Sequence, residues 1–291
     1  MTTALKRCVV RSTGLNCCRA TSSPMEGCVA TMKINKGMQK KARRMLLYGE
    51  NGIGKSTLAT QFPKPIVLNF EDGVYGIECD STDRFGSFAD LQEFLVRELP
   101  QTDYHTIVLD TADWLEKLLM DEVARQAGKA TIEDIGFGRG YQSLEKTWKK
   151  TLGMLEYFWH QNRHIIFTCH EVIDRFADPE GDTFNFYRPA LHRTGSGCVT
   201  EWCDEVLFLK HKRFTRKRDE GYNQERHIAL GTGERVIVCN KQPAIEAKNR
   251  LHLPDEVPMS IESFYEPLSG IVPNFGKREQ VVEEAVPAGM F

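Results

Sequence analysis

The sequence lacks several features that would place it in other classes of protein. Its 291 residues contain no apolar run near the roughly 20 residues that a membrane-spanning helix needs, so we expect no contact with a membrane. The nine cysteines include no C-x-x-C pair, which argues against a zinc ribbon or a thioredoxin site. The net charge of −2 gives no global attraction to nucleic acid. A cytoplasmic protein with reduced cysteines is expected.

Acidic residues are absent from the first 25 positions, although four basic residues lie there. The first acid is Glu26, and this stretch has neither a secretory signal nor an amphipathic period. We therefore predict that residues 1–40 are a disordered or non-native extension. Residues 41–253 are expected to form one domain, and residues 254–291 a partly disordered tail that is rich in proline and then in acids.

Short apolar runs alternate with helical patterns from Met45 onward. Four of these runs are typical of buried strands: MLLYG, PIVLNF, HTIVLD and IIFTCH. Helical spacing of apolar residues follows or separates them, most clearly at Leu144, Trp148, Leu152 and Leu155. The alternation predicts a three-layer α/β fold with a mostly parallel central sheet.

The second half of the chain has a different pattern. Residues 171–197 show no clear period and are expected to form a long functional loop. The later runs CDEVLFLKH, ERVIVCN and AIEAKN have no helix between them, which predicts an antiparallel hairpin at one edge of the sheet. Turn signals lie at Gly221-Tyr222 and at residues 231–233.

Residues 49–56 match the pattern G-x-x-x-x-G-K-[ST] in full, between a predicted strand and a predicted helix. This is the context of a nucleotide-binding P-loop, in which glycines let the backbone N–H groups turn toward phosphate oxygens. The Lys55 ammonium would neutralise phosphate charge, and the Ser56 hydroxyl would ligate Mg²⁺. The predicted nucleotide-binding residues are Gly49, Glu50, Asn51, Gly52, Ile53, Gly54, Lys55, Ser56 and Thr57.

Asp110 ends the apolar strand HTIVLD, where an acid is costly unless it faces a cation or a donor. We predict that it holds Mg²⁺, or a water on Mg²⁺, together with Ser56. The alternative is a role as helix N-cap, although Thr111 or Asp113 can fill that position.

Two further strand ends carry groups that are suited to catalysis. Glu71 follows the second strand and could orient and deprotonate a water molecule, or be a solvated acid in a turn. His170 ends the fourth strand, where an imidazole could sense the γ-phosphate and move the following loop, or be a satisfied histidine with no such role.

Read together, these strand ends resemble the core of RecA/RadA-type recombinases, and no guanine-reading N-K-x-D motif is present. The chain resembles, more narrowly, the short phage-encoded nucleotide-binding proteins of the P-loop AAA/RecA class, some of which are grouped with single-strand annealing or recombination proteins. The resemblance covers residues 44–260 and includes the stretches TADWLEKL, IEDIGFGRGY, DRFADPEGD, RPALHRTGS and AIEAKNRLHLP. It implies a RecA-like ATPase that uses ATP and Mg²⁺ in the cytosol of a bacterial host.

The resemblance also implies roles for single residues. Glu71 matches the glutamate that activates water, Asp110 the Walker-B acid, and His170 the residue that couples the γ-phosphate to a DNA-binding loop. Lys248 and Arg250 match cations that reach a neighbour's nucleotide, which implies a homo-oligomer, ring or filament, with an ATP site completed in trans. A solvated strand end is the alternative for AKNR. Residues 132–141 and 174–197 match the two DNA loops in position.

Cations interleaved with aromatic residues are typical of surfaces that bind single-stranded DNA, through phosphate contacts and base stacking. Two segments have this composition: the loop at residues 174–197, which also carries four acids, and the run KHKRFTRKR. The predicted nucleic-acid contacts are Arg175, Phe176, Arg188, Arg193, Lys212, Arg213 and Phe214.

Three functions are compatible with these patterns. The first is an ATPase that acts on single-stranded DNA in phage recombination or replication. The second is a nucleotide-dependent switch for a protein partner, which the near-neutral charge and the acids of the second loop would suit. The third is a small-molecule kinase, for which no arginine-rich lid is evident.

Overall fold

The computed structural model describes residues 36–37, 40–176, 181–219 and 225–269, with only the backbone described at 213–219 and 225–232. All the elements below belong to one compact unit that begins at Lys40. Most of the predicted extension at residues 1–40 and most of the predicted tail therefore lie outside the described residues.

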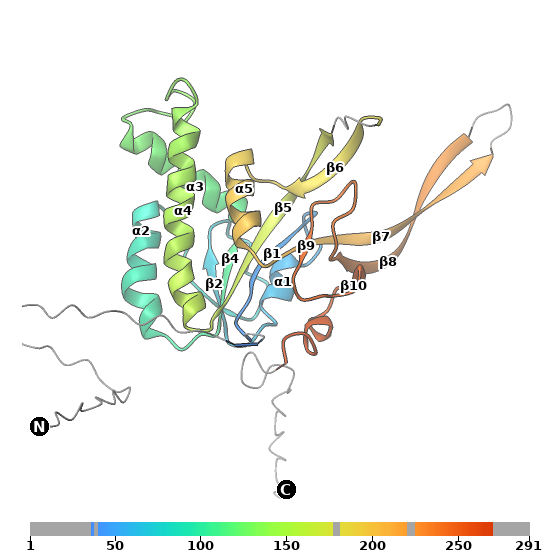
Figure 1. Ribbon diagram of the computed structural model, residues 1–291, viewed down its shortest axis with the longest axis horizontal. Coiled ribbons are helices and arrows are strands. Elements are labelled where there is room, and N and C mark those ends of the chain that lie inside the picture. Colours follow the sequence, from blue (N-terminus) through green and yellow to red (C-terminus); the bar gives the residue numbers. More distant parts are fainter. Residues whose placement is uncertain (1–35, 38–39, 177–180, 220–224, 270–291) are drawn as a thin grey trace, which may run out of the picture. The chain divides into compact units, whose positions relative to one another are not determined.

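A mixed sheet with a parallel centre organises this unit (Figure 1). Its strand order is β10-β8-β7-β1-β5-β4-β2-β3, with β6 beside β5 and β9 beside β7. The parallel strands are β1 (Arg44–Gly49), β2 (Pro65–Asn69), β3 (Asp80–Ser81), β4 (Thr106–Asp110), β5 (His164–Phe176) and β7 (Glu205–Asp219). The antiparallel additions are β6 (Phe184–Pro189), β8 (Glu225–Val238), β9 (Lys248–Asn249) and β10 (Glu256–Pro258).

The helices form the outer layers. They are α1 (Lys55–Ala59), α2 (Phe88–Glu93), the π-helical turn η1 (Phe94–Glu98), the 3₁₀ turn η2 (Leu99–Gln101), α3 (Ala112–Gln126), α4 (Arg139–His160), α5 (Arg193–Trp202) and the 3₁₀ turn η3 (Ile261–Phe264). The predicted three-layer α/β fold with a mostly parallel sheet and an antiparallel edge is confirmed.

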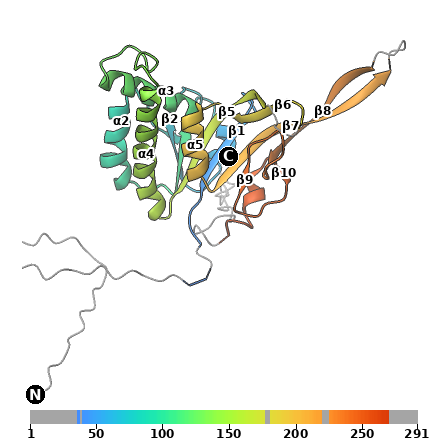
Figure 2. The ribbon, with the colours of Figure 1, turned by 45° about the horizontal axis from the view of Figure 1, so that its top comes forward.

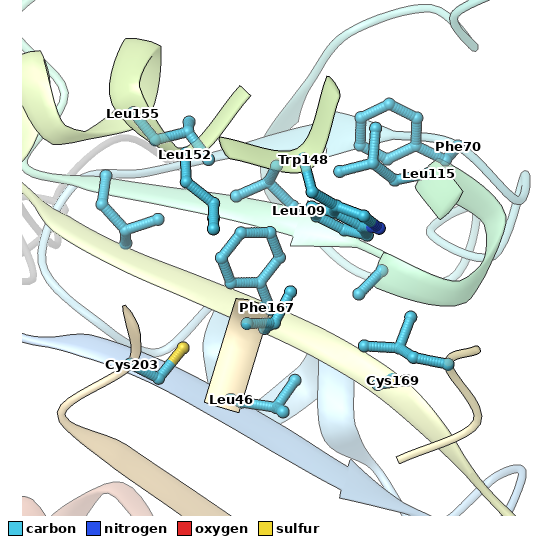
Figure 3. Close-up of a cluster of buried hydrophobic side chains, with 14 of the residues drawn as sticks. Leu46, Phe70, Leu109, Leu115, Trp148, Leu152, Leu155, Phe167, Cys169 and Cys203 are labelled. Carbon is cyan, nitrogen blue, oxygen red and sulfur yellow. The ribbon is translucent and has the colours of Figure 1, made fainter. Parts of the chain in front are cut away.

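Alternating residues of the central strands build two cores. Along β5, Ile165 and Phe167 belong to the core under α2, α3, α4 and α5, whereas Ile166 belongs to the core on the side of α1. Figure 3 shows Phe167 of β5 facing Trp148 and Leu152 of α4. Because neighbouring strand residues point to opposite faces, a strand covered on both faces must be apolar throughout, which is why these runs were readable in the sequence.

The second half differs from the prediction in three ways. The region 171–197 is not one loop, since it contains the outer half of β5, the strand β6 and the first turn of α5. The turn expected at residues 231–233 lies within β8, and AIEAKN is a strand only at β9. The predicted turn at Gly221-Tyr222 lies outside the described residues.

Buried residues continue beyond residue 253. Val257, Ile261, Phe264 and Leu268 are buried in the same core as Leu58 of α1. The amino-terminal part of the predicted tail therefore completes the layer that covers this face of the sheet.

Candidate functional site

Glycines shape the loop between β1 and α1. Gly52 and Gly54 have φ angles of 74° and 104°, in the left-handed region that residues with a Cβ rarely adopt. Gly49 is required for its small size, because a Cβ there would lie 2.2 Å from the carbonyl oxygen of Leu209 on β7. Of the three glycines in residues 49–56, Gly52 and Gly54 are thus needed for their backbone conformation and Gly49 for its small size.

Lys55 is the first residue of α1, and only 6% of it is exposed. Its Nζ donates to the carbonyl oxygens of Gly49 and Glu50, both at 3.0 Å. Burial lowers the pKa of Lys55, and the carboxylates of Asp110 and Asp113 act against this shift. The ammonium is therefore held at the loop. A buried cation is stable only beside a compensating negative charge, which a phosphate group bound there would supply.

Asp110 ends β4 and is 2% exposed. Its Oδ1 accepts hydrogen bonds from the hydroxyl groups of Ser56, at 2.8 Å, and of Thr168. Because β5 lies between β1 and β4, Thr168 reaches the acid from the intervening strand. The structure thus brings together the two side chains predicted to hold Mg²⁺.

Glu71 lies two residues beyond the end of β2, near the middle of β5, where the parallel pairing of β5 with β1 ends. Its Oε2 accepts from the Thr111 hydroxyl at 3.0 Å, and its Oε1 lies 3.7 Å from Nε2 of His170. Since Thr111 follows Asp110 directly, these contacts connect the ends of β2, β4 and β5 to the P-loop. The four strand ends singled out in the sequence meet in one place.

His170 is oriented by Asp113. Its Nδ1 lies 3.0 Å from Oδ2 of Asp113, and its backbone N–H donates to Oδ1 of the same carboxylate at 3.3 Å. The contact with Asp113 raises the pKa of His170, although burial acts against the shift. Burial pushes the pKa of Asp113 upward, but the contact with His170 outweighs it and the pKa is lowered. A carboxylate can only accept, so the proton lies on Nδ1 and Nε2 faces Glu71.

Sequence reasoning missed three residues of this site. Asp113 appeared only as a candidate cap for α3, and Thr168 and Arg235 were not considered. Thr168 had a signal, a hydroxyl in the middle of an apolar strand and two positions before His170 on the same face. Arg235 of β8 donates from Nη1 to the carbonyl oxygen of Ile53 at 3.0 Å. No signal in the sequence indicates this contact, because the two residues are 182 positions apart.

The remaining P-loop residues differ in burial. Ile53 is buried in the core on the side of α1, whereas Asn51 and Thr57 are exposed. Glu50 faces His211 of β7, with Oε1 and Nε2 3.5 Å apart.

Lys248 contacts the carboxyl end of α5. Its Nζ donates to the carbonyl oxygens of Thr200, Glu201 and Cys203, at 3.0, 2.9 and 2.6 Å. The last carbonyls of a helix have no partner within the helix, and a cation there also meets the negative end of the helix dipole. Lys248 is therefore the cap of α5.

Arg250 lies at the end of the sheet where β1 begins, and the P-loop lies at the end where β1 finishes. It pairs with Asp204, at 2.9 Å, and Asp204 also pairs with Arg44 at the start of β1. Five residue steps of β1 separate Arg44 from Gly49, or about 16 Å along an extended strand. The Arg250 side chain is therefore held far from the P-loop of its own chain, and it is 56% exposed, so another molecule can reach it.

The predicted nucleic-acid residues lie on three elements. Arg175 and Phe176 are exposed on the hairpin of β5 and β6, where the Phe176 ring packs on Phe184 and Phe186 at centroid distances of 5.3 and 6.0 Å. Arg188 of the same hairpin is bonded to Asp174 at 2.6 Å and to two carbonyl oxygens. Arg188 thus shapes the hairpin.

The other predicted contacts are dispersed. Arg193 is exposed at the first turn of α5. Lys212 lies at the base of the β7–β8 hairpin, near Glu234 and Glu256, at 3.8 and 3.9 Å. Arg213 and Phe214 are in β7, and their side chains lie outside the described residues.

A comparison with protein families agrees with the geometry of the loop and the strand ends. The family model described as AAA domain matches residues 41–251, most of the chain. The chain belongs to the AAA domain family. It is thus a P-loop domain of AAA type, and the match covers every element from β1 to β9.

A curated relative adds an association with phage. The chain is 25% identical over 158 residues to the SPbeta prophage-derived uncharacterized protein YorG of Bacillus subtilis (strain 168). The alignment covers 51% of this chain and 47% of that protein, so the chain spans about half the length of the relative it matches. Among the described residues, every helix is too short or too polar to cross a membrane.

Proposed function

We propose that this AAA domain binds ATP with Mg²⁺, hydrolyses it, and acts on single-stranded DNA during phage recombination or replication, in the cytosol of a bacterial host. The observation that carries the proposal is a set of contacts beside the buried Lys55: Ser56 of the P-loop donates to Asp110, and Thr111, the next residue, donates to Glu71, which faces His170. The RecA-like part of the proposal rests on the sequence resemblance together with this set of contacts.

Mg²⁺ would lie between Ser56, Asp110 and the nucleotide. This ion usually keeps several waters and takes only one or two protein ligands beside substrate phosphates. No group of three His, Cys, Asp or Glu side chains within the described part of the chain could hold a metal ion alone. The proposed site has two protein side chains, Ser56 and Asp110, and the nucleotide phosphates would supply further ligands of the ion. The ion would neutralise the charge that develops on the phosphoryl oxygens.

Glu71 is the base that we propose for the attacking water. Thr111 and Nε2 of His170 lie close to its two oxygens, which fixes the direction of the carboxylate. Glu71→Gln would keep the shape of the side chain but remove the base, so ATP binding should persist while turnover falls by about 10²–10⁴-fold. Asp72→Asn is the matched control, since Asp72 pairs with Arg84.

A DNA-binding surface is supported by exposed aromatic residues near the starts of α4 and α5. Phe137 lies between two glycines with a φ of 60° and is 97% exposed, and the Arg139 guanidinium lies 5.9 Å from its ring centroid. Tyr141 and His192 stack at 4.1 Å and join the two helix starts. With Phe176, these side chains supply stacking faces beside cations, a combination that binds single strands without reading their sequence.

The nucleotide site and this surface share structural elements. His170 and Phe176 lie on the same strand, β5, six residues apart. Asp113 and Glu116 lie one turn apart on α3, and Glu116 Oε2 accepts from the backbone N–H of His192 at 2.6 Å. A change at His170 can therefore reach both the β5–β6 hairpin and the start of α5.

A nucleotide-dependent switch for a protein partner is the second candidate. The ion pair of Arg188 with Asp174 favours it, because this pair neutralises a cation on the hairpin that DNA would need. A partner protein would bind in the presence of nucleotide and would not compete with DNA.

The deciding experiment is ATP turnover at low salt across a titration with single-stranded DNA, beside a sizing measurement. The first proposal expects turnover to rise with DNA and the protein to assemble. Phe137→Ala and Phe176→Ala should weaken the DNA response and leave the DNA-free turnover unchanged. Turnover that is flat across the titration would contradict the DNA role and favour the switch.

A further inference from the structure

The base of the β7–β8 hairpin touches the P-loop at three successive points. Gly49 lies so close to Leu209 of β7 that it can carry no side chain. Oε1 of Glu50 lies 3.5 Å from Nε2 of His211, also on β7. The carbonyl oxygen of Ile53 accepts from Nη1 of Arg235 on β8 at 3.0 Å. Both strands of the hairpin therefore contact the loop that is proposed to hold the phosphates.

His211 and Arg235 are directly opposite each other in the hairpin register. On one side of this pair, β7 joins the sheet, because Glu205–Leu209 pair with Met45–Gly49 of β1. On the other side a bulge follows His211, and the register from Arg213 to Asp219 joins β7 to β8. Figures 1 and 2 show the two strands leaving the sheet beyond this point. The contacts with the P-loop are thus at the junction between sheet and hairpin.

Arg235 is packed against the rim of the P-loop. A Cβ on Gly54 would lie 2.8 Å from Nη1 of Arg235 and 3.1 Å from Cε of Met259. The backbone of Met259 donates to the carbonyl oxygen of Arg235 at 3.0 Å, which connects β8 to the segment after β10. Gly54 therefore serves two purposes: it adopts the φ of 104° that the loop backbone has there, and its lack of a side chain leaves room for the guanidinium.

The hairpin base is also tied to β10. Nζ of Lys210 lies 3.6 Å from Glu256, and Nζ of Lys212 lies 3.9 Å from the same carboxylate. These partly exposed ion pairs of β7 contribute little to stability one by one, but β8 pairs directly with β10, so both strands of the hairpin base contact β10. A displacement of the P-loop would then move the base of the hairpin as a unit.

We propose that His211 and Arg235 form a clasp that positions the P-loop for nucleotide and makes the order of the β7–β8 hairpin depend on the bound nucleotide. Phosphate binding fixes the amides of residues 50–55, and with them the Ile53 carbonyl and the Glu50 side chain that the clasp holds. Coupling between two sites is reciprocal, so whatever binds the hairpin changes nucleotide affinity by the same factor. The inference rests on the proposed nucleotide binding and goes beyond it.

Hydrogen–deuterium exchange of the full-length protein, with and without Mg²⁺ and a non-hydrolysable ATP analogue, tests the clasp. In the wild type, nucleotide should slow exchange at residues 205–219 and 225–238 by about fivefold or more, within the usual range of coupling between sites. Arg235→Ala should still bind the analogue, within about tenfold of the wild type, but its hairpin amides should no longer respond. Arg235→Lys keeps one donor for the Ile53 carbonyl and should restore part of the response, whereas the surface control Arg97→Ala should match the wild type.

Two outcomes would overturn the clasp, and they differ from a failure of the proposed function. If the analogue binds the wild type and the exchange rates of the hairpin amides do not change, the loop and the hairpin are uncoupled. A hairpin response that persists in Arg235→Ala would show that Arg235 is not the connection. Wild-type protein that does not bind the analogue in a direct titration would contradict nucleotide binding itself, and the clasp with it.

Discussion

Glu116 shows how much one buried side chain determines in this fold. It is 4% exposed on α3, and its two oxygens accept from Nε1 of Trp148 at 3.1 Å and from the backbone N–H of His192 at 2.6 Å. Burial raises the pKa of Glu116 to about 7, although both hydrogen bonds act in the opposite direction. This carboxylate connects α3, α4 and the start of α5, and its protonation has a measurable consequence.

Glu116→Gln should change how stability depends on pH. Between pH 4.5 and about pH 7 the native state keeps a proton on Glu116 that the unfolded state releases, so the free energy of unfolding falls as pH rises through this window. The difference corresponds to about 3 kcal/mol, an order-of-magnitude figure from 1.36 kcal/mol per unit of pKa. Denaturant unfolding at pH 5 and pH 8 should show the wild type losing most of this amount relative to the variant, because pH 5 already lies just inside the window.

Glu93→Gln, an exposed carboxylate on α2, is the control and should follow the wild type at both pH values. Parallel profiles for Glu116→Gln and the wild type would contradict the raised pKa. Glu205, whose pKa burial also raises to about 7, is present in all three proteins and cancels in the comparison.

Site residues were predictable from the sequence where they belong to a motif or directly follow a predicted strand. Lys55, Ser56, Glu71, Asp110 and His170 all reach the same place, because carboxyl ends of parallel strands share one edge of a sheet. Asp113, Glu116, Arg235 and the capping role of Lys248 were not predictable. Their partners lie 32 to 182 positions away, and such contacts depend on how whole elements pack.

At the scale of elements, α5 is a helix that was not predicted from the sequence. It contains two glycines, Gly195 and Gly197, which weaken a helical pattern by about 1 kcal/mol each relative to alanine. Gly195 is required, because a Cβ there would lie 1.8 Å from Oε1 of Glu116 and 2.6 Å from Nε1 of Trp148. Packing, rather than helix propensity, selects this residue.

The two glycines of α5 give a matched pair of variants. Gly195→Ala should destabilise the domain by about 3 kcal/mol or more, since the methyl group must displace a buried carboxylate. Gly197→Ala meets no heavy atom within 4 Å and should be neutral or stabilise the helix by up to about 1 kcal/mol. Thermal and denaturant unfolding would measure both, and equal effects in the two variants would refute the packing argument.

Elements buried on both faces were the most predictable, because β1, β2, β4 and the first half of β5 are continuous apolar runs. The outer half of β5 and most of β6 are exposed or only partly buried, and the two segments together mix cations, acids and aromatic residues, so no period marks them. Their pairing is antiparallel and leaves the main sheet, which only the tertiary structure reveals.

At the scale of the whole molecule, the two edges of the sheet carry different groups. The carboxyl ends of the parallel strands hold the P-loop and the acids, and the opposite edge carries Arg250 with its partner Asp204. A group so placed can assist hydrolysis only at the nucleotide of another protomer. That arrangement would make turnover depend on assembly.

Arg250→Ala should lower turnover by about 10³-fold or more, the effect of an arginine supplied in trans, with little change in ATP affinity. Mixing it with Lys55→Ala should restore part of the activity, because a Lys55→Ala protomer still offers its Arg250 to the intact site of its neighbour. Turnover of the mixture no higher than the sum of the two variants would exclude a trans role. Asp204 keeps its pair with Arg44 in this variant, so the fold should remain intact.

The central claim is that the P-loop and the strand ends together bind a magnesium-bound triphosphate. Equilibrium titration with Mg²⁺ and a non-hydrolysable ATP analogue, comparing the wild type with Lys55→Ala, tests it most directly. Lys64→Ala, at an exposed ion pair with Asp103, is the control. We predict saturable binding at one site per chain in the wild type and in Lys64→Ala, and loss of binding in Lys55→Ala with an unchanged fold by circular dichroism. Equal affinity in Lys55→Ala would contradict the account.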